Sequence, residues 1–332
     1  MKLQRMLQSV LIHAGLLLGA VVMVFPFFWM VTTSFKSPEE VLDNDHWLPQ
    51  EKFYHTFTNP LGEVEEVELE RLGEPEPASG RVPVKHLSGS FRGRRESLEP
   101  GQIVRRVWLW QNYVQAWTQV QPSFGRYFWV STVTAVLTTI GQVLTSLLAA
   151  YAFVFFRFRG QSVLFMLVLA TMMVPQQVLL IPDFLILKKL GLFNTTAALV
   201  VPWIAGAFGI FLLQQFFQSI PRDLHDAAVV DGCSRFGFLW RILIPLSVPP
   251  ILTLSIFTFL SSWNSLLWPL IATDSPGLRT VQVGLSFFSQ ESGTRWELLM
   301  AASTFSILPL VALYFVFQRQ FIQGIAHTGL KG

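Results

Sequence analysis

The charged residues of this chain are distributed very unevenly along it, and this constrains its fold more than any other feature. Six long stretches contain no Asp, Glu, Lys or Arg. A bilayer core is about 30 Å thick, so a helix rising about 1.5 Å per residue crosses it in about 20 residues. Each stretch is therefore long enough to span a membrane. The six stretches are Val10–Val31, Tyr127–Phe156, Gly160–Pro182, Leu190–Pro221, Ile242–Thr273 and Leu298–Gln318.

This pattern predicts an all-α membrane protein with six transmembrane helices. Of the 332 residues, 52% are hydrophobic and 14% charged, whereas about a quarter are charged in soluble domains. The one cysteine, Cys233, excludes a disulfide scaffold. The first helix, within residues 1–35, is too long for a signal peptide and lacks a cleavage site, so we interpret it as retained. The other five helices are predicted over 127–156, 160–182, 190–217, 247–273 and 298–318.

Basic residues in the short connections predict the orientation, because cytoplasmic loops are rich in Lys and Arg. If both termini are cytoplasmic, nine basic residues lie on that side and four lie in the opposite short loops. We therefore expect both termini to be cytoplasmic. The nine are Lys2, Arg5, Arg157, Arg159, Arg222, Arg235, Arg241, Arg319 and Lys331, and the four are Lys188, Lys189, Arg279 and Arg295.

A long polar segment, residues 36–126, lies between the first two predicted helices and is expected outside the cytoplasm. It holds 14 of the 21 acidic and 11 of the 24 basic residues. The alternation in Val64–Glu70 is compatible with a strand, and Glu74–Gly80 is typical of a turn. A small β-rich excursion is one interpretation, and a solvated, partly flexible loop is the other. Its cluster Arg92–Arg95 lacks interleaved aromatic residues, so nucleic acid is not an expected partner.

The sequence contains no motif for catalysis or metal binding. The uncharged cores of the predicted helices offer only His13 as a titratable group, so the chain is not expected to transduce an ion gradient. The sequence has no phosphate-binding loop, no H-E-x-x-H motif and no G-x-S-x-G elbow. The other histidines are scattered without metal-ligand spacing. We expect no catalytic residue, no metal and no cofactor bound by this chain.

The connection between the fourth and fifth predicted helices, within residues 218–246, has the most informative local pattern. Pro221 suits the first turn of a helix, and Asp223 and Asp226 complement the dipole at that N-terminus. Asp231-Gly232 can end this helix in a turn, because glycine accepts a positive φ. A short helix followed by a turn is therefore expected here.

A second helix is expected to follow this turn. Ser234 can cap its N-terminus, and the helix would run into the membrane at Pro245. In the short helix before the turn, Ala227 and Ala228 offer a flat surface on which another protein could approach closely. The pattern therefore allows two interpretations, a docking helix and an ordinary helix–turn–helix connection.

The string Asp226-Ala-Ala-x-x-Asp231-Gly232, followed by Ile242-x-Ile-Pro245-Leu246, resembles the Glu-Ala-Ala loop of ABC importer permeases, and in particular of the maltose-type carbohydrate permeases. The resemblance covers most of the chain except about residues 58–107, whose role is open. Its other elements are Ser34-Phe-Lys-Ser-Pro-Glu-Glu, Asn112-Tyr-x-x-Ala-Trp, Phe124-Gly-Arg-Tyr-Phe, Leu148-Ala-Ala-Tyr-Ala-Phe, Trp263-Asn264, Leu267-Trp-Pro-Leu270 and Gly329-Leu-Lys-Gly332.

Three positions depart from the family pattern. Asp226 stands where the family usually has Glu, and Cys233 where it usually has Ala, so charge and small size are kept. Ser265 follows Asn264 where many relatives have Glu, which bears on the choice of substrate.

The resemblance implies a permease core over residues 127–318 and a cytoplasmic tail over 319–332, in a prokaryotic inner membrane. A second, different permease chain would complete the pathway, and two ATPase subunits would bind ATP and Mg. An extracytoplasmic solute-binding protein would deliver a sugar. The residues implied to couple the chain to the ATPase are Asp223, Asp226, Ala227, Ala228, Asp231, Gly232 and Ser234.

Residues that line the pathway are expected among polar and aromatic side chains of the membrane helices. Sugars are recognised by aromatic faces and amide groups, and an amide at membrane depth is costly unless it faces the interior. The candidates are Gln142, Gln176, Gln177, Trp263, Asn264 and Trp268. Such residues also bridge helices, and Trp268 also suits the membrane interface. Pro175 and Pro182 are predicted to kink the third helix.

Two other classes of function stay open on the sequence. A passive channel or carrier fits the missing ATP motifs. A membrane enzyme or sensor would work through its outer segment, residues 36–126.

Overall fold

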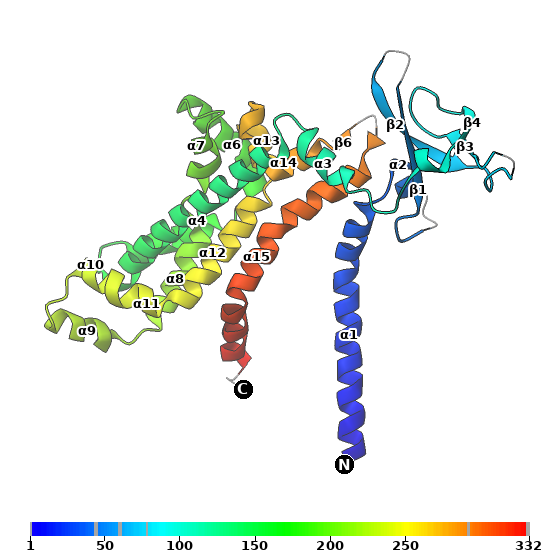
Figure 1. Cartoon of the computed structure of the whole chain (residues 1–332). Helices are drawn as coiled ribbons and strands as arrows, with labels where there is room; N and C mark the ends of the chain where they lie inside the picture. Colours follow the sequence, from blue (N-terminus) through cyan, green and yellow to red (C-terminus); the bar gives the residue numbers. More distant parts are fainter. Residues whose placement is uncertain (1, 43–45, 59–61, 78, 291–292, 330–332) are drawn as a thin grey trace. The chain divides into compact units, whose positions relative to one another are not determined.

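The computed structural model describes residues 2–42, 46–58, 62–77, 79–290 and 293–329 (Figure 1). The predicted tail residues 330–332 lie outside the described residues. The chain divides into two compact units. We call Met1–Trp117 with Phe288–Phe305 the sheet unit, and Thr118–Phe287 with Ser306–Gly332 the helical unit.

The sheet unit begins with α1 (Lys2–Thr33), an unbroken helix of 32 residues that contains the predicted stretch Val10–Val31. Its apolar part, Met6–Thr33, has a mean hydropathy of 2.3. Large apolar side chains are exposed along it, including Leu17 and Met23. A helix that exposes apolar side chains in this way suits lipid rather than water.

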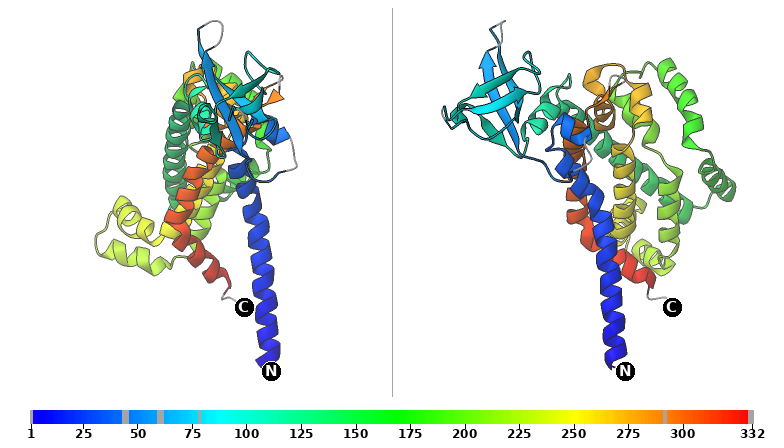
Figure 2. Two further views of the ribbon diagram at one scale, coloured as in Figure 1. Left: turned by 45° about the vertical axis from the view of Figure 1, so that its right-hand side comes forward. Right: turned by 90° about the vertical axis from the view of Figure 1, so that its right-hand side faces the viewer.

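A five-stranded antiparallel sheet follows α1, with strand order β4-β3-β2-β1-β5 (Figure 2). Its core contains Val67 and Leu69 of β2 and Val82 and Val84 of β3. In β3 these positions alternate with more exposed ones, whereas in β2 Glu68, between Val67 and Leu69, is buried as well. The segment contains five strands, and the predicted strand Val64–Glu70 falls within β2. The strands are β1 (Lys52–Thr58), β2 (Val64–Arg71), β3 (Val82–His86), β4 (Arg95–Leu98) and β5 (Val104–Arg106).

The first and last strands of the sheet are neighbours. β1 pairs with β5, so that Lys52 lies opposite Arg106. Asn112 also holds the two ends of the segment together, because its Nδ2 donates to the Ser34 carbonyl at 2.9 Å and the Lys36 carbonyl at 2.8 Å. The remaining elements of this unit are α2 (Pro38–Leu42), η1 (Pro100–Gln102), α3 (Gln111–Thr118), β6 (Ser289–Gln290), β7 (Gly293–Thr294) and the first turns of α15 (Trp296–Gly329).

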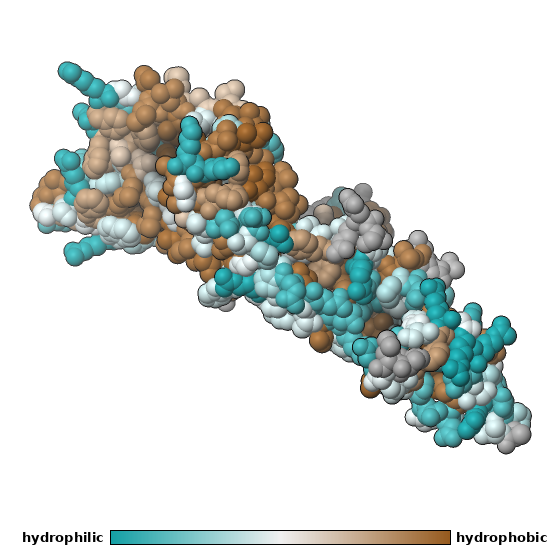
Figure 3. All heavy atoms as spheres, turned by 90° about the horizontal axis from the view of Figure 1, so that it is seen from above, coloured by the Kyte–Doolittle hydropathy of each residue, from teal (hydrophilic) through white to brown (hydrophobic). Residues whose placement is uncertain are grey.

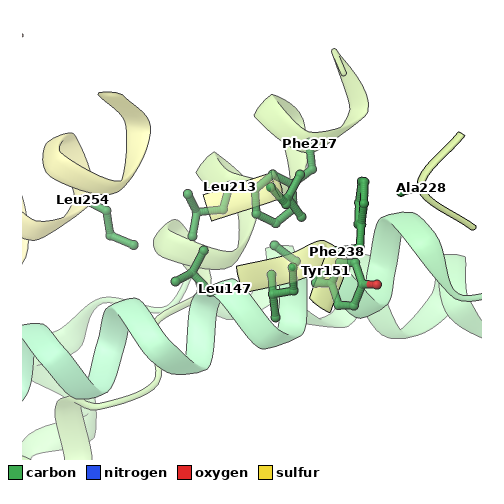
Figure 4. Close-up of a cluster of buried hydrophobic side chains, with 10 residues drawn as sticks. Leu147, Tyr151, Leu213, Phe217, Ala228, Phe238 and Leu254 are labelled. Atoms are coloured by element: carbon green, nitrogen blue, oxygen red, sulfur yellow. The ribbon is translucent and has the colours of Figure 1, made fainter. Parts of the chain in front are cut away.

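The helical unit is built around α4 (Phe124–Phe155), a helix of 32 residues. Both α8 (Ala207–Gln218) and α12 (Val248–Trp263) pack along α4. A buried cluster joins the three helices through Leu147 of α4, Leu213 of α8 and Leu254 of α12 (Figure 4). Figure 3 shows apolar residues, coloured brown, gathered over a large part of the surface of the molecule. Such a surface is expected of helices that face lipid.

The third predicted span, 160–182, is wrong as a single helix. It is divided into α5 (Gln161–Thr171) and α6 (Gln176–Lys189), whose axes differ by 102°. Pro175 caps α6, and proline both lacks an N–H and disfavours a helical conformation in the residue before it. The predicted kink at Pro175 is therefore a complete break, whereas Pro182 lies inside α6.

The fourth and fifth predicted spans, 190–217 and 247–273, are also not single helices. The fourth span is divided by a bend of 41° just before α8. In the region of the fifth span, a bend of 80° lies just before α12, and α12 already ends at Trp263. Within the described residues, three helices are long and apolar enough to cross a membrane, and up to six spans result if each bent pair counts as one. The further elements are α7 (Thr196–Val200), η2 (Val201–Trp203), α10 (Arg235–Phe238), η3 (Leu239–Leu243), α11 (Ile244–Leu246), α13 (Leu267–Ala272), η4 (Pro276–Leu278) and α14 (Val281–Ser286).

Candidate functional site

The helix predicted after Pro221 is present as α9 (Arg222–Val230). Pro221 is its N-cap residue, and Asp223 lies in its first turn, where a negative charge is favourable. Ser234 caps the next helix, α10, because its Oγ accepts a hydrogen bond from the Gly237 amide at 3.1 Å. The helix, turn and second helix predicted from the sequence are therefore confirmed.

Gly232 forms the turn between α9 and α10 with φ at +75°, a conformation that side chains rarely adopt. Its amide donates to the Val229 carbonyl at 3.0 Å, and the Cys233 amide donates to the Ala228 carbonyl at 2.9 Å. These two bonds form a Schellman motif, which satisfies carbonyls at the end of α9. The turn is thus fixed by its own hydrogen bonds.

Ala228 faces inward, which corrects the prediction that it belongs to a flat exposed surface. It is buried in the cluster that contains Tyr151 and Phe238, whereas Ala227 beside it is exposed (Figure 4). The Tyr151 hydroxyl also donates to the Arg235 carbonyl at 3.0 Å. The loop is therefore packed firmly onto the end of α4.

The outer side of the same loop is both acidic and apolar. The carboxylates of Asp223, Asp226 and Asp231 are exposed there. Large apolar side chains are exposed next to them, with Val230 at 86% and Phe236 at 67%. Exposed apolar side chains next to charges are typical of a surface that contacts another protein.

A cavity of about 510 Å³ lies in the helical unit, lined by residues of α4, α6, α8, α12 and α13. α6, α7 and α13 lie at the end of this unit opposite α9 (Figures 1 and 2). Most of the polar side chains in the cavity wall are hydroxyls and amides. A ligand with many hydroxyl groups could exchange hydrogen bonds with such a wall.

One wall of the cavity is a polar stripe on α4. Thr134, Thr138 and Gln142 line the cavity at intervals of four residues, which places them on one face of the helix. Thr134 and Thr138 are 4% and 2% exposed. Within the described part of the chain, neither hydroxyl has a hydrogen-bond partner. Buried polar groups are nearly always paired, so these two hydroxyls are suited to a ligand or water.

The wall formed by α12 and the residues after it is also rich in hydroxyls. Ser261, Ser262 and Ser265 line the cavity together with Thr258. Aromatic rings complete the lining, and those of Trp203 and Trp268 meet edge to face at 5.5 Å. Hydroxyls can exchange hydrogen bonds with sugar hydroxyls, and aromatic faces can contact a sugar ring.

Three of the six pathway candidates line this cavity, namely Gln142, Gln176 and Trp268. The Trp268 ring is buried, and its Nε1 donates to the Ala198 carbonyl at 3.0 Å. Trp268 therefore joins helices as well as lining the cavity.

The other three candidates, Gln177, Trp263 and Asn264, are not part of the cavity lining. Trp263 is buried and its Nε1 donates to the Ser306 carbonyl at 3.1 Å, so it joins helices. The Asn264 Nδ2 donates to the Leu260 carbonyl at 2.9 Å at the end of α12. Gln177 is exposed on α6.

The threonines and serines of the cavity were not predicted from the sequence. Thr134, Thr138 and Gln142 share a four-residue spacing that was visible in the sequence, but many other hydroxyl residues occur in the same helices. The described residues contain no group of three His, Cys, Asp or Glu side chains that could hold a metal ion.

Residues 122–327 match the family described as the binding-protein-dependent transport system inner membrane component. The chain belongs to this family. It is a multi-pass permease subunit of an ABC importer in the inner membrane, and it is a transport subunit rather than an enzyme.

Three curated permeases illustrate the relationship. The probable ABC transporter permease YurM of Bacillus subtilis is 35% identical, over 74% of this chain and 82% of the relative. The arabinooligosaccharide permease AraQ of Halalkalibacterium halodurans is 36% identical, over 63% and 74% respectively. The sn-glycerol-3-phosphate permease UgpE of Yersinia enterocolitica is 34% identical, over 69% and 84%.

The fold resembles a chain in the crystal structure of a bacterial ABC transporter involved in the import of the acidic polysaccharide alginate. The TM-score is 0.65, with 20% identity, and the match covers 94% of this chain and 96% of that chain. A second crystal structure holds the alginate transporter with its pentasaccharide-bound periplasmic protein, with a TM-score of 0.51 and 17% identity. At these identities the likeness shows the fold alone.

Proposed function

We propose that this chain forms half of the pathway of an importer for a neutral sugar or oligosaccharide. The cavity with the unpaired hydroxyls of Thr134 and Thr138 carries the proposal. Hydroxyl and amide groups can exchange hydrogen bonds with sugar hydroxyls, and aromatic faces can contact the sugar ring. The permeases named above include one for arabinooligosaccharides, which agrees with this substrate class.

The proposed topology has six spans and two cytoplasmic termini. α1, α4 and α15 are three of the spans, and the three bent pairs are the others. The excess of basic residues on one side supports this orientation. The sheet then lies outside the cytoplasm, α9 lies inside it, and the cavity lies in the half of the helical unit away from α9.

The α9–α10 loop couples this chain to an ATPase subunit. The residues that make this contact are those proposed from the family resemblance. Its exposed side offers carboxylates and the apolar side chains of Val230 and Phe236. Its inner side is anchored by Ala228 and Tyr151. A surface that docks on one side and is rigidly anchored on the other can transmit a rigid-body motion to α4 and α8.

The proposed assembly contains an ATPase dimer, a second and different permease chain and an extracytoplasmic solute-binding protein. ATP and Mg bind to the ATPase, and this chain binds neither. The family description, which makes these systems dependent on a binding protein, supports the last of these partners.

The test is to tag the full chain, extract it in mild detergent from its native membrane and identify what co-purifies. We expect an ATPase, a second permease and a binding protein. After reconstitution in liposomes, the complex should take up a labelled oligosaccharide only with ATP and the binding protein. Recovery of the chain alone, under conditions that preserve another importer, together with flux that needs no ATP, would favour a passive carrier.

The outer segment allows a second, independent test. Deletion of residues 58–107 should leave most of the ATP-dependent uptake, because the proposed pathway and coupling loop lie elsewhere. Complete loss of activity in a complex that still assembles would favour a sensor or enzyme that works through the segment.

A further inference from the structure

The lining of the cavity includes a carboxylate, that of Asp183. Asp183 lies midway along α6, whose other polar side chains are at its two ends, Gln176 and Gln177 at the start and Lys188 and Lys189 in the last turn. Among the described residues that line the cavity there is no Lys and no Arg, and Asp183 is the only acidic one. The wall therefore combines a single negative charge with neutral hydrogen-bonding groups.

The Asp183 carboxylate has no structural role in the described part of the chain that would explain it. It is half-buried, and it forms no hydrogen bond or ion pair with any described residue. An ionisable group in an apolar helix of a membrane protein is costly, and those that occur usually face a cavity or pathway. The unpaired hydroxyls of Thr134 and Thr138 in the same cavity point independently to a polar ligand there.

We propose that Asp183 determines the charge selectivity of the cavity: it repels anionic solutes and lets neutral, polyhydroxylated ones pass. This inference rests on the proposed function of the cavity as half of a sugar pathway. Family membership does not fix the charge of the solute, because the permeases named above include one for sn-glycerol-3-phosphate, an anion. A single charge in a confined cavity acts strongly on a charged solute, because little water is present to screen it.

The field of Asp183 can be measured without knowing the substrate. In the assembled importer in nanodiscs, Cys233→Ser removes the native thiol and Ser262→Cys places one in the cavity wall. The probes are a cationic and an anionic methanethiosulfonate reagent. The rate at which each reagent modifies the cavity cysteine is divided by its rate of reaction with free 2-mercaptoethanol. The ratio of the two normalised rates, cationic over anionic, reports the field in the cavity. We expect the cationic reagent to be favoured on the order of fivefold or more.

Asp183→Asn should bring this ratio close to one, and Asp183→Glu should restore it. Asp274→Asn is the matched control, because Asp274 is exposed and lies outside the cavity lining, so the ratio should not change. Asp183→Ser serves as a second neutral variant if Asp183→Asn does not assemble.

The outcomes separate this inference from the proposed function. Equal ratios with and without the Asp183 carboxylate would overturn the inference and leave the pathway intact. If neither reagent modifies Ser262→Cys in any transport state, water does not enter the cavity, and the proposed pathway itself is wrong. Uptake of an oligosaccharide that carries a uronic acid should rise relative to its neutral counterpart in Asp183→Asn, once the binding protein has been shown to bind both.

Discussion

The cavity and the α9–α10 loop use their polar groups in opposite ways. In the loop, the amides of Gly232, Cys233 and Gly237 all have partners within the loop itself. In the cavity, the hydroxyls of Thr134 and Thr138 are buried and have no partner in the described part of the chain. The first region therefore satisfies these amides itself, whereas the second leaves two buried hydroxyls without a protein partner.

Other threonines of α4 bond the preceding turn, although the buried hydroxyl of Ser146, outside the cavity lining, also has no partner in the described part of the chain. Thr132 donates to the Phe128 carbonyl at 2.8 Å, and Thr139 donates to the Ala135 carbonyl at 2.7 Å. A threonine in a helix can thus satisfy itself on the preceding turn. The loop is anchored near the C-terminal end of α4, at Tyr151, whereas the unpaired hydroxyls of Thr134 and Thr138 lie in the middle of the same helix.

The largest effect is expected from Gly232→Pro, which should lower ATP-dependent uptake by about a hundredfold or more. Proline holds φ near −65°, whereas this turn requires +75°, so the loop cannot keep its shape for docking. Uptake and retention of the ATPase are measured on the purified complex. Gly62→Pro, at another glycine with positive φ, is the control and should retain uptake. Normal transport by Gly232→Pro would refute the coupling role.

A neighbouring pair of alanines separates anchoring from docking. Ala228→Leu should lower the free energy of unfolding by about 1–3 kcal/mol, because it overfills the buried cluster, and uptake should fall roughly tenfold. Ala227→Leu should leave the stability unchanged, since Ala227 is exposed. The thermal midpoint and the uptake rate of both variants are compared. Equal losses of stability would show that Ala228 does not anchor the loop.

The double variant Thr134→Val and Thr138→Val should raise the sugar concentration for half-maximal uptake roughly thirtyfold. Two hydrogen bonds of about 1 kcal/mol each would be lost, while the fold loses none, because neither hydroxyl has a partner in the described chain. The thermal midpoint should therefore stay the same or rise. Thr139→Val is the control, since its hydroxyl bonds the helix backbone. Unchanged uptake by the double variant would argue against sugar contact at these positions.

The smallest effect concerns the pH dependence of the sheet. Burial lowers the pKa of His86, outweighing the Glu96 carboxylate, which raises it. The folded state therefore binds the proton less well than the unfolded state, and stability is lost as the pH falls below about 6.5. Hydrogen exchange of β2 and β3 in the assembled importer should increase a few-fold from pH 7.5 to 5.5, after correction for intrinsic rates.

His86→Phe should remove this increase, whereas His55→Gln, at a partly exposed position, should keep it. Burial also raises the pKa of Glu68, although Lys52 lowers it, so this group loses its contribution as the pH rises. The two groups act in opposite directions, and the His86 variant isolates one of them. Identical exchange profiles for the variant and the native chain would exclude His86 as the cause.

The sequence predicted the loop well because its signals are local. Pro221, Gly232 and Ser234 each act on backbone groups within a few residues of their own position. The local sequence is therefore enough to predict the helix, the turn and the second helix. The inward orientation of Ala228 could not be predicted, because it depends on Tyr151 and Phe238 from other elements.

The broken helices and the cavity were harder to predict for a different reason. An uncharged run shows that a segment can enter a membrane, but it does not show that the helix is continuous across Pro175. In membrane helices, both the lipid-facing and the buried sides are apolar, so periodicity gives little guidance about which side chains face inward. Trp263 and Asn264 were therefore proposed for the pathway. In the structure the Trp263 ring bonds the Ser306 carbonyl of α15, and the Asn264 amide bonds the Leu260 carbonyl of its own helix.

The pairing of Lys52 with Arg106 has an evolutionary consequence. A segment whose two ends meet can be gained or lost by a single genetic event without stretching the chain on either side. The family match begins at residue 122, after this segment. Because its ends lie side by side, the sheet can occupy the connection between α1 and α3 without pulling these two helices apart.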